Sequence, residues 1–153
     1  MNLTSYKEIA FQREGRILRI ILNRPDRLNA VNHALHIELA RVFQEAAADR
    51  DSDVLVFTGA GRAFCAGGDL AWLQQDMEHL EPFVEEAQTV RNIVYGIIDC
   101  PKPIIARVNG DAMGLGASMA LLCDIIIAVR TAKFADPHVR VGLVAGDGGV
   151  IAW

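Results

Sequence analysis

Two glycine-rich turns carry the residue types that could do chemistry in this chain. One spans residues 64–70 and the other spans residues 109–117, and each is expected to join a buried strand to a helix. The first N–H groups of a helix have no partner within it and lie at the positive end of its dipole. Two such turns facing one another could hold a carbonyl oxygen that becomes negative during a reaction.

Glycine also has an ordinary role in such turns, and spacing alone leaves both interpretations open. Tight strand-to-helix connections are common in α/β folds whatever their function. Neither turn matches a phosphate-binding motif, because the chain contains no G-x-G-x-x-G and no G-x-x-x-x-G-K-[ST]. The sequence therefore gives no support to a dinucleotide or nucleoside triphosphate site.

The elements that must position these turns alternate between two kinds of pattern. Short runs of branched apolar residues indicate buried strands, and apolar residues at three- and four-residue intervals indicate amphipathic helices. We expect strands over residues 15–22, 53–58, 104–108 and 124–129, and helices over residues 33–48, 69–79, 82–98 and 114–122. Such alternation favours parallel pairing with right-handed crossovers, so the expected class is α/β.

Composition limits the possible classes of protein. The chain has 153 residues, 52% of them hydrophobic and 22% charged, so one domain over residues 1–153 can bury a core, and disorder is excluded. A net charge of −4 without a basic block argues against a nucleic-acid partner. No apolar run approaches the roughly 20 residues that cross a bilayer, so no membrane association is expected. Three widely spaced cysteines fit neither a disulfide framework nor a metal site, which predicts reduced thiols in a cytoplasmic protein without a bound metal.

The last residues are apolar and begin what is expected to be a further helix after a glycine loop. Val150, Ile151 and Trp153 would expose apolar side chains without a partner surface. We therefore expect that C-terminal structure is missing from this chain, or that an oligomer covers these side chains.

Five separated motifs, in order along nearly the whole chain, resemble the enoyl-CoA hydratase/isomerase (crotonase) superfamily. They lie at residues 23–31, 59–70, 101–106, 109–110 and 123–125. The resemblance implies a crotonase-like spiral of ββα units whose C-terminal helical part is absent here. It also implies a homo-oligomer, a trimer or hexamer, and an acyl-CoA thioester as the small-molecule substrate. Coenzyme A would be part of that substrate, and no separate cofactor is expected.

The resemblance further implies which residues bind the thioester. Its carbonyl oxygen would be held by the backbone amides of Gly68 and Leu115, with an enolate as the intermediate. Two loops would line the path of the adenine and pantetheine groups, and two arginines would contact phosphates. These residues are Asn29, Ala30, Ala66 and Gly67 for the path, and Arg24 and Arg27 for the phosphates. For the arginines, an exposed loop without such contacts is the alternative.

Both glutamates that hydratases of this family use to activate water are replaced, by Ser118 and His138. A histidine titrates near neutral pH and can act as a general base. Asp147 follows in a glycine turn, where it could orient the imidazole. We therefore expect His138 to lie beside Asp147 and to face the space between the Gly68 and Leu115 amides. A purely structural histidine is the alternative.

Three functions stay open on these residues. The first choice is a lyase or isomerase of the family that acts on an acyl-CoA thioester. The alternative is a CoA-independent hydrolase of carbon–carbon bonds in cyclic β-diketones, because His138 and Asp147 resemble the pair of such family members. An aspartate in this loop also resembles the nucleophile of the family's aryl-CoA dehalogenases. The third is a non-catalytic member.

The remaining polar and large apolar residues are assigned ordinary roles. We expect turn or helix caps at Asp69, Asp111 and Asp136, and exposed side chains on helices at His33, His36 and His79. Arg140 is expected to be solvated. Trp72 and Met77 are expected in the core or in an acyl-pocket wall.

Overall fold

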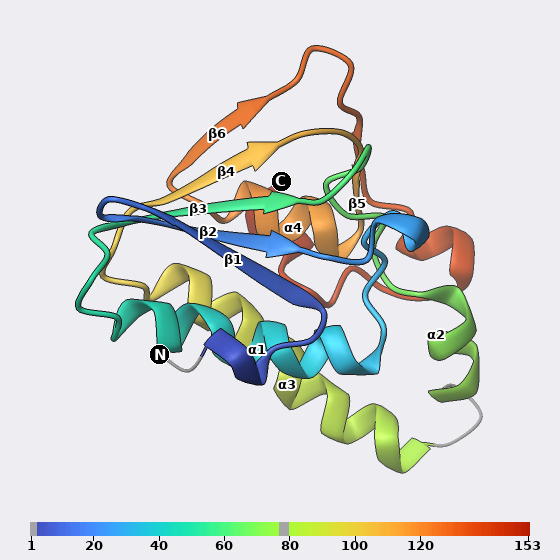
Figure 1. Cartoon of the computed structure of the whole chain (residues 1–153). Coiled ribbons are helices and arrows are strands. Elements are labelled where there is room, and N and C mark those ends of the chain that lie inside the picture. Colours follow the sequence, from blue (N-terminus) through green and yellow to red (C-terminus); the bar gives the residue numbers. More distant parts are fainter. Residues whose placement is uncertain (1–2, 77–79) are drawn as a thin grey trace.

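The computed structural model describes residues 3–76 and 80–153. Its main sheet has five strands in the order β1-β2-β3-β4-β6 (Figure 1). They are β1 Ile9–Glu14, β2 Ile17–Leu22, β3 Val54–Gly59, β4 Ile104–Val108 and β6 Ile125–Ala128. β1 pairs with β2 as an antiparallel hairpin, and every other neighbouring pair in this sheet is parallel. A second, parallel sheet pairs β5 (Ala112–Met113) with β7 (Phe134–Ala135).

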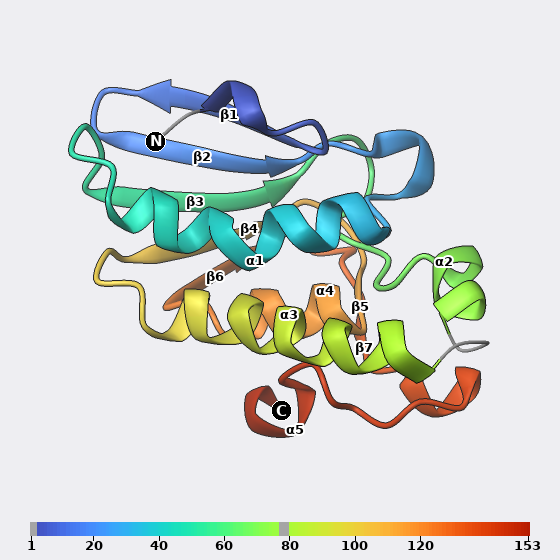
Figure 2. The ribbon, with the colours of Figure 1, turned by 90° about the horizontal axis from the view of Figure 1, so that it is seen from below.

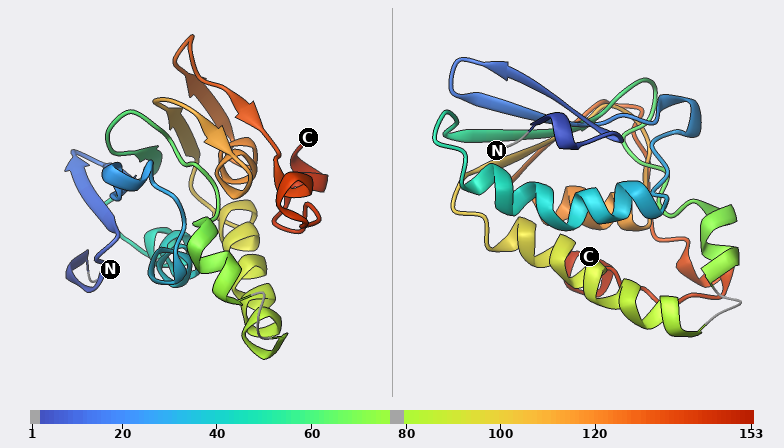
Figure 3. Two further views of the ribbon diagram at one scale, coloured as in Figure 1. Left: turned by 90° about the vertical axis from the view of Figure 1, so that its right-hand side faces the viewer. Right: turned by 60° about the horizontal axis from the view of Figure 1, so that its bottom comes forward.

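The described residues also form five α-helices and three short 3-10 turns, of which α1 to α4 and the second turn lie between strands. The helices are α1 His33–Ala47, α2 Leu70–Asp76, α3 Leu80–Ile98, α4 Leu115–Leu121 and α5 Gly149–Ala152, and the turns are Leu3–Ser5, Pro25–Arg27 and His138–Val141. α1 and α3 pack side by side and cover one face of the main sheet (Figures 2 and 3). No helix in the part of the chain that the structure describes is long and apolar enough to cross a membrane.

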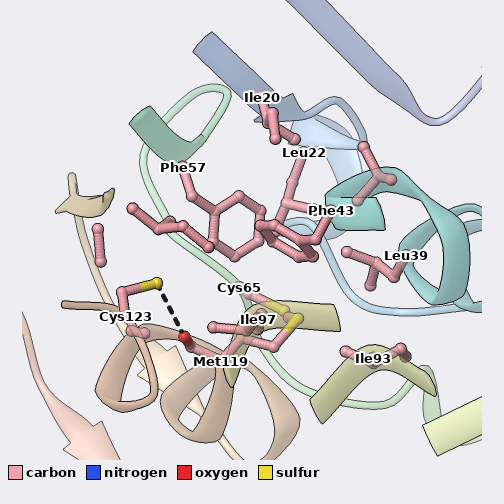
Figure 4. Packing of buried hydrophobic residues seen from close by; sticks show 14 of the residues in the cluster. Ile20, Leu22, Leu39, Phe43, Phe57, Cys65, Ile93, Ile97, Met119 and Cys123 are labelled. Carbon is pink, nitrogen blue, oxygen red and sulfur yellow. Dashed lines mark hydrogen bonds between the residues drawn. The ribbon is translucent and has the colours of Figure 1, made fainter. Parts of the chain in front are cut away.

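The core lies between the sheet and the two long helices. Alternate residues of β2, which are Leu18, Ile20 and Leu22, are fully buried, as the two-residue period of a strand requires. Phe57 of β3 stands edge to face with Phe43 of α1, at 5.2 Å between ring centroids (Figure 4). This packing anchors the carboxyl end of β3, from which residues 60–63 lead into the first glycine-rich turn.

The expected α/β class and parallel pairing are confirmed, and each expected strand and helix has a counterpart close to its expected position. The sequence analysis missed β1, β5 and β7. β5 and β7 are only two residues long, too short to show a periodic pattern. The expected helix over residues 69–79 begins at Leu70, but its last positions, including Met77 and His79, lie outside the described residues.

The expectation that His36 faces solvent is wrong. His36 is 2% exposed, because its side chain packs against Trp72 of α2, with 5.2 Å between ring centroids. α2 therefore widens the buried face of α1 beyond the apolar stripe that the sequence shows. His33 is exposed, as expected. Val150, Ile151 and Trp153 are also exposed, as the sequence analysis expected.

Candidate active site

The two glycine-rich turns lie against one another. A bridge between Cys65 and Ala112 aligns them, and the Met113 N–H donates to the Cys65 carbonyl at 2.9 Å. Gly67 has a φ of +87°, and a Cβ on it would lie 2.9 Å from the Met113 carbonyl oxygen. A side chain at Gly67 would therefore strain the backbone and separate the turns.

A third loop closes the other side of the first turn. The Val31 N–H donates to the Gly67 carbonyl at 2.7 Å, and the Asp69 N–H donates to the Val31 carbonyl at 2.8 Å. These bonds leave Gly68 between two paired positions with its own N–H uncommitted. Among the described residues, no backbone hydrogen bond between elements has the Gly68 or the Leu115 N–H as donor. Leu115 is the first residue of α4, where the N–H has no acceptor within the helix.

Gly68 and Leu115 both line a pocket of about 500 Å³. Its wall is mainly apolar, and its polar and charged side chains are His36, Arg91, His138 and Asp147. The apolar side chains are Val31, Leu70, Trp72, Leu73, Val90, Leu115, Pro137, Val141, Leu143 and Val144. Trp72 thus belongs to a pocket wall, which is one of the two places expected for it. The volume and lining are typical of a site for a small molecule with a substantial apolar part.

His138 stands at the start of the 3-10 turn His138–Val141, directly after β7 and the Asp136–Pro137 pair. Its Nε2 lies 2.9 Å from Asp147 Oδ2, and its Nδ1 is in hydrogen-bond contact with Asp136 Oδ1. A Cβ on Gly114 would lie 3.4 Å from the His138 Cε1. The ring therefore lies directly against the second glycine-rich turn, next to the Leu115 amide.

Asp147 connects the histidine to α4. Its Oδ1 accepts a hydrogen bond of 2.9 Å from the Ser118 hydroxyl, while its Oδ2 faces His138. Ser118 lies on α4 one turn after Leu115 and is 1% exposed. The Asp147 side chain is 10% exposed and the His138 side chain 16%. The contact between His138 and Asp147 is therefore largely shielded from solvent, while both residues line the pocket.

His138 affects the pKa of the Asp136 carboxyl group. Burial acts to raise the pKa of Asp136, but the hydrogen bonds from the His138 ring and backbone N–H outweigh burial and lower that pKa below its ordinary value. Asp136 is therefore an ionised acceptor at neutral pH. In contrast, burial raises the pKa of the Cys65 thiol to about 12, which leaves it protonated and unreactive beside the first turn.

The structure brings six of the ten predicted site residues to the pocket. Those that line it are Ala66, Gly67, Gly68, Leu115, His138 and Asp147. The expected approach of His138 to Asp147 is confirmed. Asp147 contacts Nε2 of the ring, and Nδ1 is in contact with Asp136, for which only a capping role was predicted. Asp136 does accept the His138 N–H at 3.2 Å as a turn cap would.

The four other predicted residues are not among those that line the pocket. The Arg24 guanidinium lies 3.5 Å from Glu8 and 3.3 Å from Asp69 and bonds to the Ala30 carbonyl. Asn29 is buried with a φ of +56°, and its side-chain amide donates to the Ala63 carbonyl at 2.9 Å. Both side chains thus hold the loop beside the first turn. Arg27 is exposed, so of the two arginines it has the freer guanidinium for a phosphate contact.

Sequence reasoning gave no site role to Asp136 or His36. The Asp-x-His spacing is a usable signal for the first, because an aspartate can bond the backbone N–H two residues on. His36 carried no such signal, since it lines the pocket only through the packing of α2 on α1.

Within residues 3–76 and 80–153, no group of three His, Cys, Asp or Glu side chains is placed to hold a metal.

Comparison with known proteins agrees with this geometry. The family model described as Enoyl-CoA hydratase/isomerase matches residues 12–153. The chain is 38% identical to the 1,2-epoxyphenylacetyl-CoA isomerase of Escherichia coli over 140 residues, which are 89% of this chain and 53% of the relative. It is 37% identical to the 2,3-dehydroadipyl-CoA hydratase of the same organism over 93% of this chain and 54% of the relative.

Solved structures give the same assignment. An enoyl-CoA hydratase/isomerase from Mycobacterium paratuberculosis superposes with a TM-score of 0.92 at 45% identity, covering 95% of this chain and 59% of that one. A crotonase-type protein from Legionella pneumophila superposes with a TM-score of 0.87 at 31% identity, covering 94% of this chain and 56% of that one.

The chain belongs to the enoyl-CoA hydratase/isomerase family and has the crotonase fold. It spans about half the length of the curated relatives it matches.

Proposed function

We propose that this chain binds an acyl-CoA thioester and stabilises an enolate-type intermediate. The Gly68 and Leu115 N–H groups hold the thioester carbonyl oxygen, and His138 moves a proton near the acyl carbons. Asp147 accepts the hydrogen bond of the imidazolium that forms. Both compared relatives from Escherichia coli are named for CoA thioesters, which supports this class of substrate.

One observation carries the proposal: Gly68 and Leu115, whose N–H groups donate no backbone hydrogen bond between elements among the described residues, line the same pocket as His138 and Asp147. Donors fixed by the backbone need no rearrangement when negative charge develops on the oxygen. Removing one such donor costs about 10²–10³-fold in turnover, or about 3–4 kcal/mol. A mainly apolar wall strengthens this interaction because it excludes water.

The proton-transfer step is assigned to histidine because the two hydratase glutamate positions hold Ser118 and His138. Ser118 is buried and donates to Asp147, so its hydroxyl orients a carboxylate instead of acting as one. His138 lies beside the Leu115 amide and can reach carbon atoms next to a carbonyl held there. Proton abstraction or donation at these carbons suits isomerisation or addition to a double bond.

The oxyanion role is tested by a matched pair of variants at Leu115. Leu115→Pro removes the proposed donor N–H at the first helical position, where proline fits the helix backbone. Leu115→Ala keeps the N–H and shortens the same side chain. We expect turnover of a 2-enoyl-CoA by the full chain to fall about 10²–10³-fold in the proline variant relative to the alanine variant. Equal turnover in the two folded variants would contradict the proposal.

A second function is favoured by the 2.9 Å contact between His138 Nε2 and Asp147 Oδ2. This pair could activate water for hydrolysis of a carbon–carbon bond in a cyclic β-diketone without CoA. Calorimetry with an acyl-CoA and a consumption assay with a cyclic β-diketone separate the two. Binding of acyl-CoA supports the first function, and diketone consumption without CoA binding supports the second. Silence in both assays favours a non-catalytic member.

Self-association as a trimer or hexamer stays a prediction of the family resemblance. Exposed apolar side chains support it, with Val144 at 86%, Val139 at 82% and Val150 at 80% exposure. Exposed apolar side chains that cluster are typical of interaction surfaces. Sedimentation velocity of the full chain measures the oligomeric state directly, and a monomer across the concentration range would contradict the prediction.

A further inference from the structure

Asp136 lies directly before the turn that carries His138. Its Oδ1 accepts the backbone N–H of His138 at 3.2 Å and also contacts Nδ1 of the same residue's ring. One carboxylate oxygen therefore fixes the backbone and the ring together. An aspartate that only caps the turn needs the bond from the backbone N–H, so capping does not explain the contact with the ring nitrogen.

The opposite edge of the ring shows what the second contact achieves. Nε2 lies 2.9 Å from Asp147 Oδ2, and Gly114 lies against the Cε1 and Nε2 edge. Turning the ring by half a turn would place Cδ2 and Cε1 where the two nitrogens now meet carboxylate oxygens. Both contacts between a ring nitrogen and a carboxylate oxygen would be lost. Asp136 and Asp147 together select one orientation of the ring.

The contact also selects the position of a proton. An ionised carboxylate accepts hydrogen bonds and donates none, so the bond to Asp136 requires the proton on Nδ1. Burial acts to raise the pKa of Asp136, but the bonds from His138 lower it below its ordinary value, which keeps the acceptor ionised. Nε2 is then the nitrogen left to exchange a proton with a molecule in the pocket.

We propose that Asp136 is a positioning residue that keeps Nδ1 of His138 protonated and turns Nε2 toward Asp147 and the pocket. Asp147 then stands on the reacting side of the ring, ready to accept the N–H that forms when Nε2 takes a proton. The consequence for turnover rests on the proposed function. The consequence for the ring does not, because it depends only on contacts within the chain.

The ring is tested by long-range ¹H–¹⁵N NMR of the full chain, which reads the protonation of each ring nitrogen of histidine. His138→Ala identifies the His138 signals by their absence. The variants are Asp136→Ala and Asp136→Asn, and Asp111→Ala is the matched control. Asp111 Oδ1 accepts a backbone N–H from Lys133 at 3.1 Å, and within the described part of the chain the histidine ring that bonds a capping aspartate is that of His138 with Asp136. Circular dichroism confirms that each variant is folded.

We expect an Nδ1-protonated His138 in the wild type and in Asp111→Ala. In Asp136→Ala we expect the proton to move from Nδ1 to Nε2, because Asp147 Oδ2 still faces Nε2. Asp136→Asn should keep the wild-type tautomer, because its amide oxygen can still accept the Nδ1 proton. On a converted 2-enoyl-CoA, kcat should fall about 10- to 100-fold in Asp136→Ala with KM within about twofold, a smaller loss than that of removing the base itself.

Wild-type His138 signals in folded Asp136→Ala would overturn the proposal, and so would an equal loss of kcat in Asp111→Ala. Changed His138 signals in a series where neither wild type nor variant converts any CoA thioester would support the positioning role and count against the proposed function. The positioning role of Asp136 and the proposed function can therefore be contradicted independently.

Discussion

His138 Nε2 lies 2.9 Å from Asp147 Oδ2, although a 3-10 turn and a glycine loop separate the two residues in the chain. A further contact on each side chain holds the pair in place. Asp136 contacts Nδ1 of the His138 ring, and the Ser118 hydroxyl donates to Oδ1 of Asp147. The hydrogen bond from Ser118 joins this contact to α4, the helix that begins at Leu115.

His138→Ala should lower turnover of a 2-enoyl-CoA about 10²–10⁴-fold with little change in binding, because it removes the proposed proton-transfer group. Val139→Ala is the matched control. Val139 follows in the same turn, is 82% exposed and does not line the pocket. Steady-state kinetics and calorimetry with the same thioester measure both effects. Unchanged turnover in folded His138→Ala would remove histidine from the mechanism.

Gly114→Ala should lower activity beyond its effect on stability. Gly114 has a φ of +51° and a ψ of −123°, a conformation that a residue with a Cβ rarely adopts, so alanine would strain the backbone directly before the proposed Leu115 donor. The added Cβ itself would make only ordinary contacts with His138, at 3.4 Å from Cε1 and 3.6 Å from Nε2. Gly15→Ala is the control, because Gly15 has a φ of +56° with open space around it. Both changes should cost about 1–2 kcal/mol of backbone strain by chemical denaturation. Only Gly114→Ala should lose turnover, and equal activities would contradict this.

Cys100 should react with a thiol reagent well before Cys65 and Cys123. Burial raises the pKa of both Cys65 and Cys123 to about 12, whereas Cys100 is partly exposed. Only a thiolate reacts quickly. Titration with Ellman's reagent should therefore show one accessible thiol in the native protein and three after unfolding. Three rapid thiols without denaturant would count against the buried positions.

The raised pKa values of these two thiols also predict a loss of stability at high pH. Unfolded thiols ionise near pH 8.5, whereas the folded thiols stay protonated up to about pH 12. Their contribution to stability is therefore complete below about pH 8.5 and is lost as the pH rises toward the folded pKa. Cys65→Ser should flatten this part of the profile in urea unfolding measured between pH 7 and pH 11. A profile identical to that of the wild type would refute the assignment.

Asp49→Asn should lower the free energy of unfolding at pH 7 by about 1–3 kcal/mol. Asp49 is 7% exposed and accepts hydrogen bonds from Ser52 at 2.7 Å and Arg13 at 2.9 Å. Burial acts to raise its pKa, but the bonds from Ser52 and Arg13 lower it below its ordinary value. The charge therefore stabilises the fold above about pH 4, and this contribution is lost as the pH falls through the folded pKa.

Urea unfolding at pH 7 and pH 3 measures this dependence. The difference between wild type and Asp49→Asn should shrink at the lower pH. Asp51→Asn is the control, because Asp51 is an exposed neighbour in the same loop, and it should change stability little at either pH. An equal effect of the two substitutions at pH 7 would contradict a stabilising role for the bonds of Asp49.

The sequence by itself determined β2, β3, β4 and β6 and the helices between them, the two glycine-rich turns and the family, because these are carried by local periodicity and by motifs along the chain. It also placed His138 and Asp147 in one site. Their spacing alone did not do this; the family resemblance supplied it. The short β5 and β7 escaped notice, since two residues show no period.

The tertiary structure alone decided how each polar side chain uses its donors and acceptors. Arg24 turns inward because Glu8 and Asp69 come from distant segments to meet it. His36 enters the pocket wall because α2 packs on α1. Asp136 could have capped only the backbone of His138, as its spacing suggested. Its bond to the ring depends on Gly114 and Asp147 holding the far edge of the imidazole, and no local sequence pattern encodes that three-way contact.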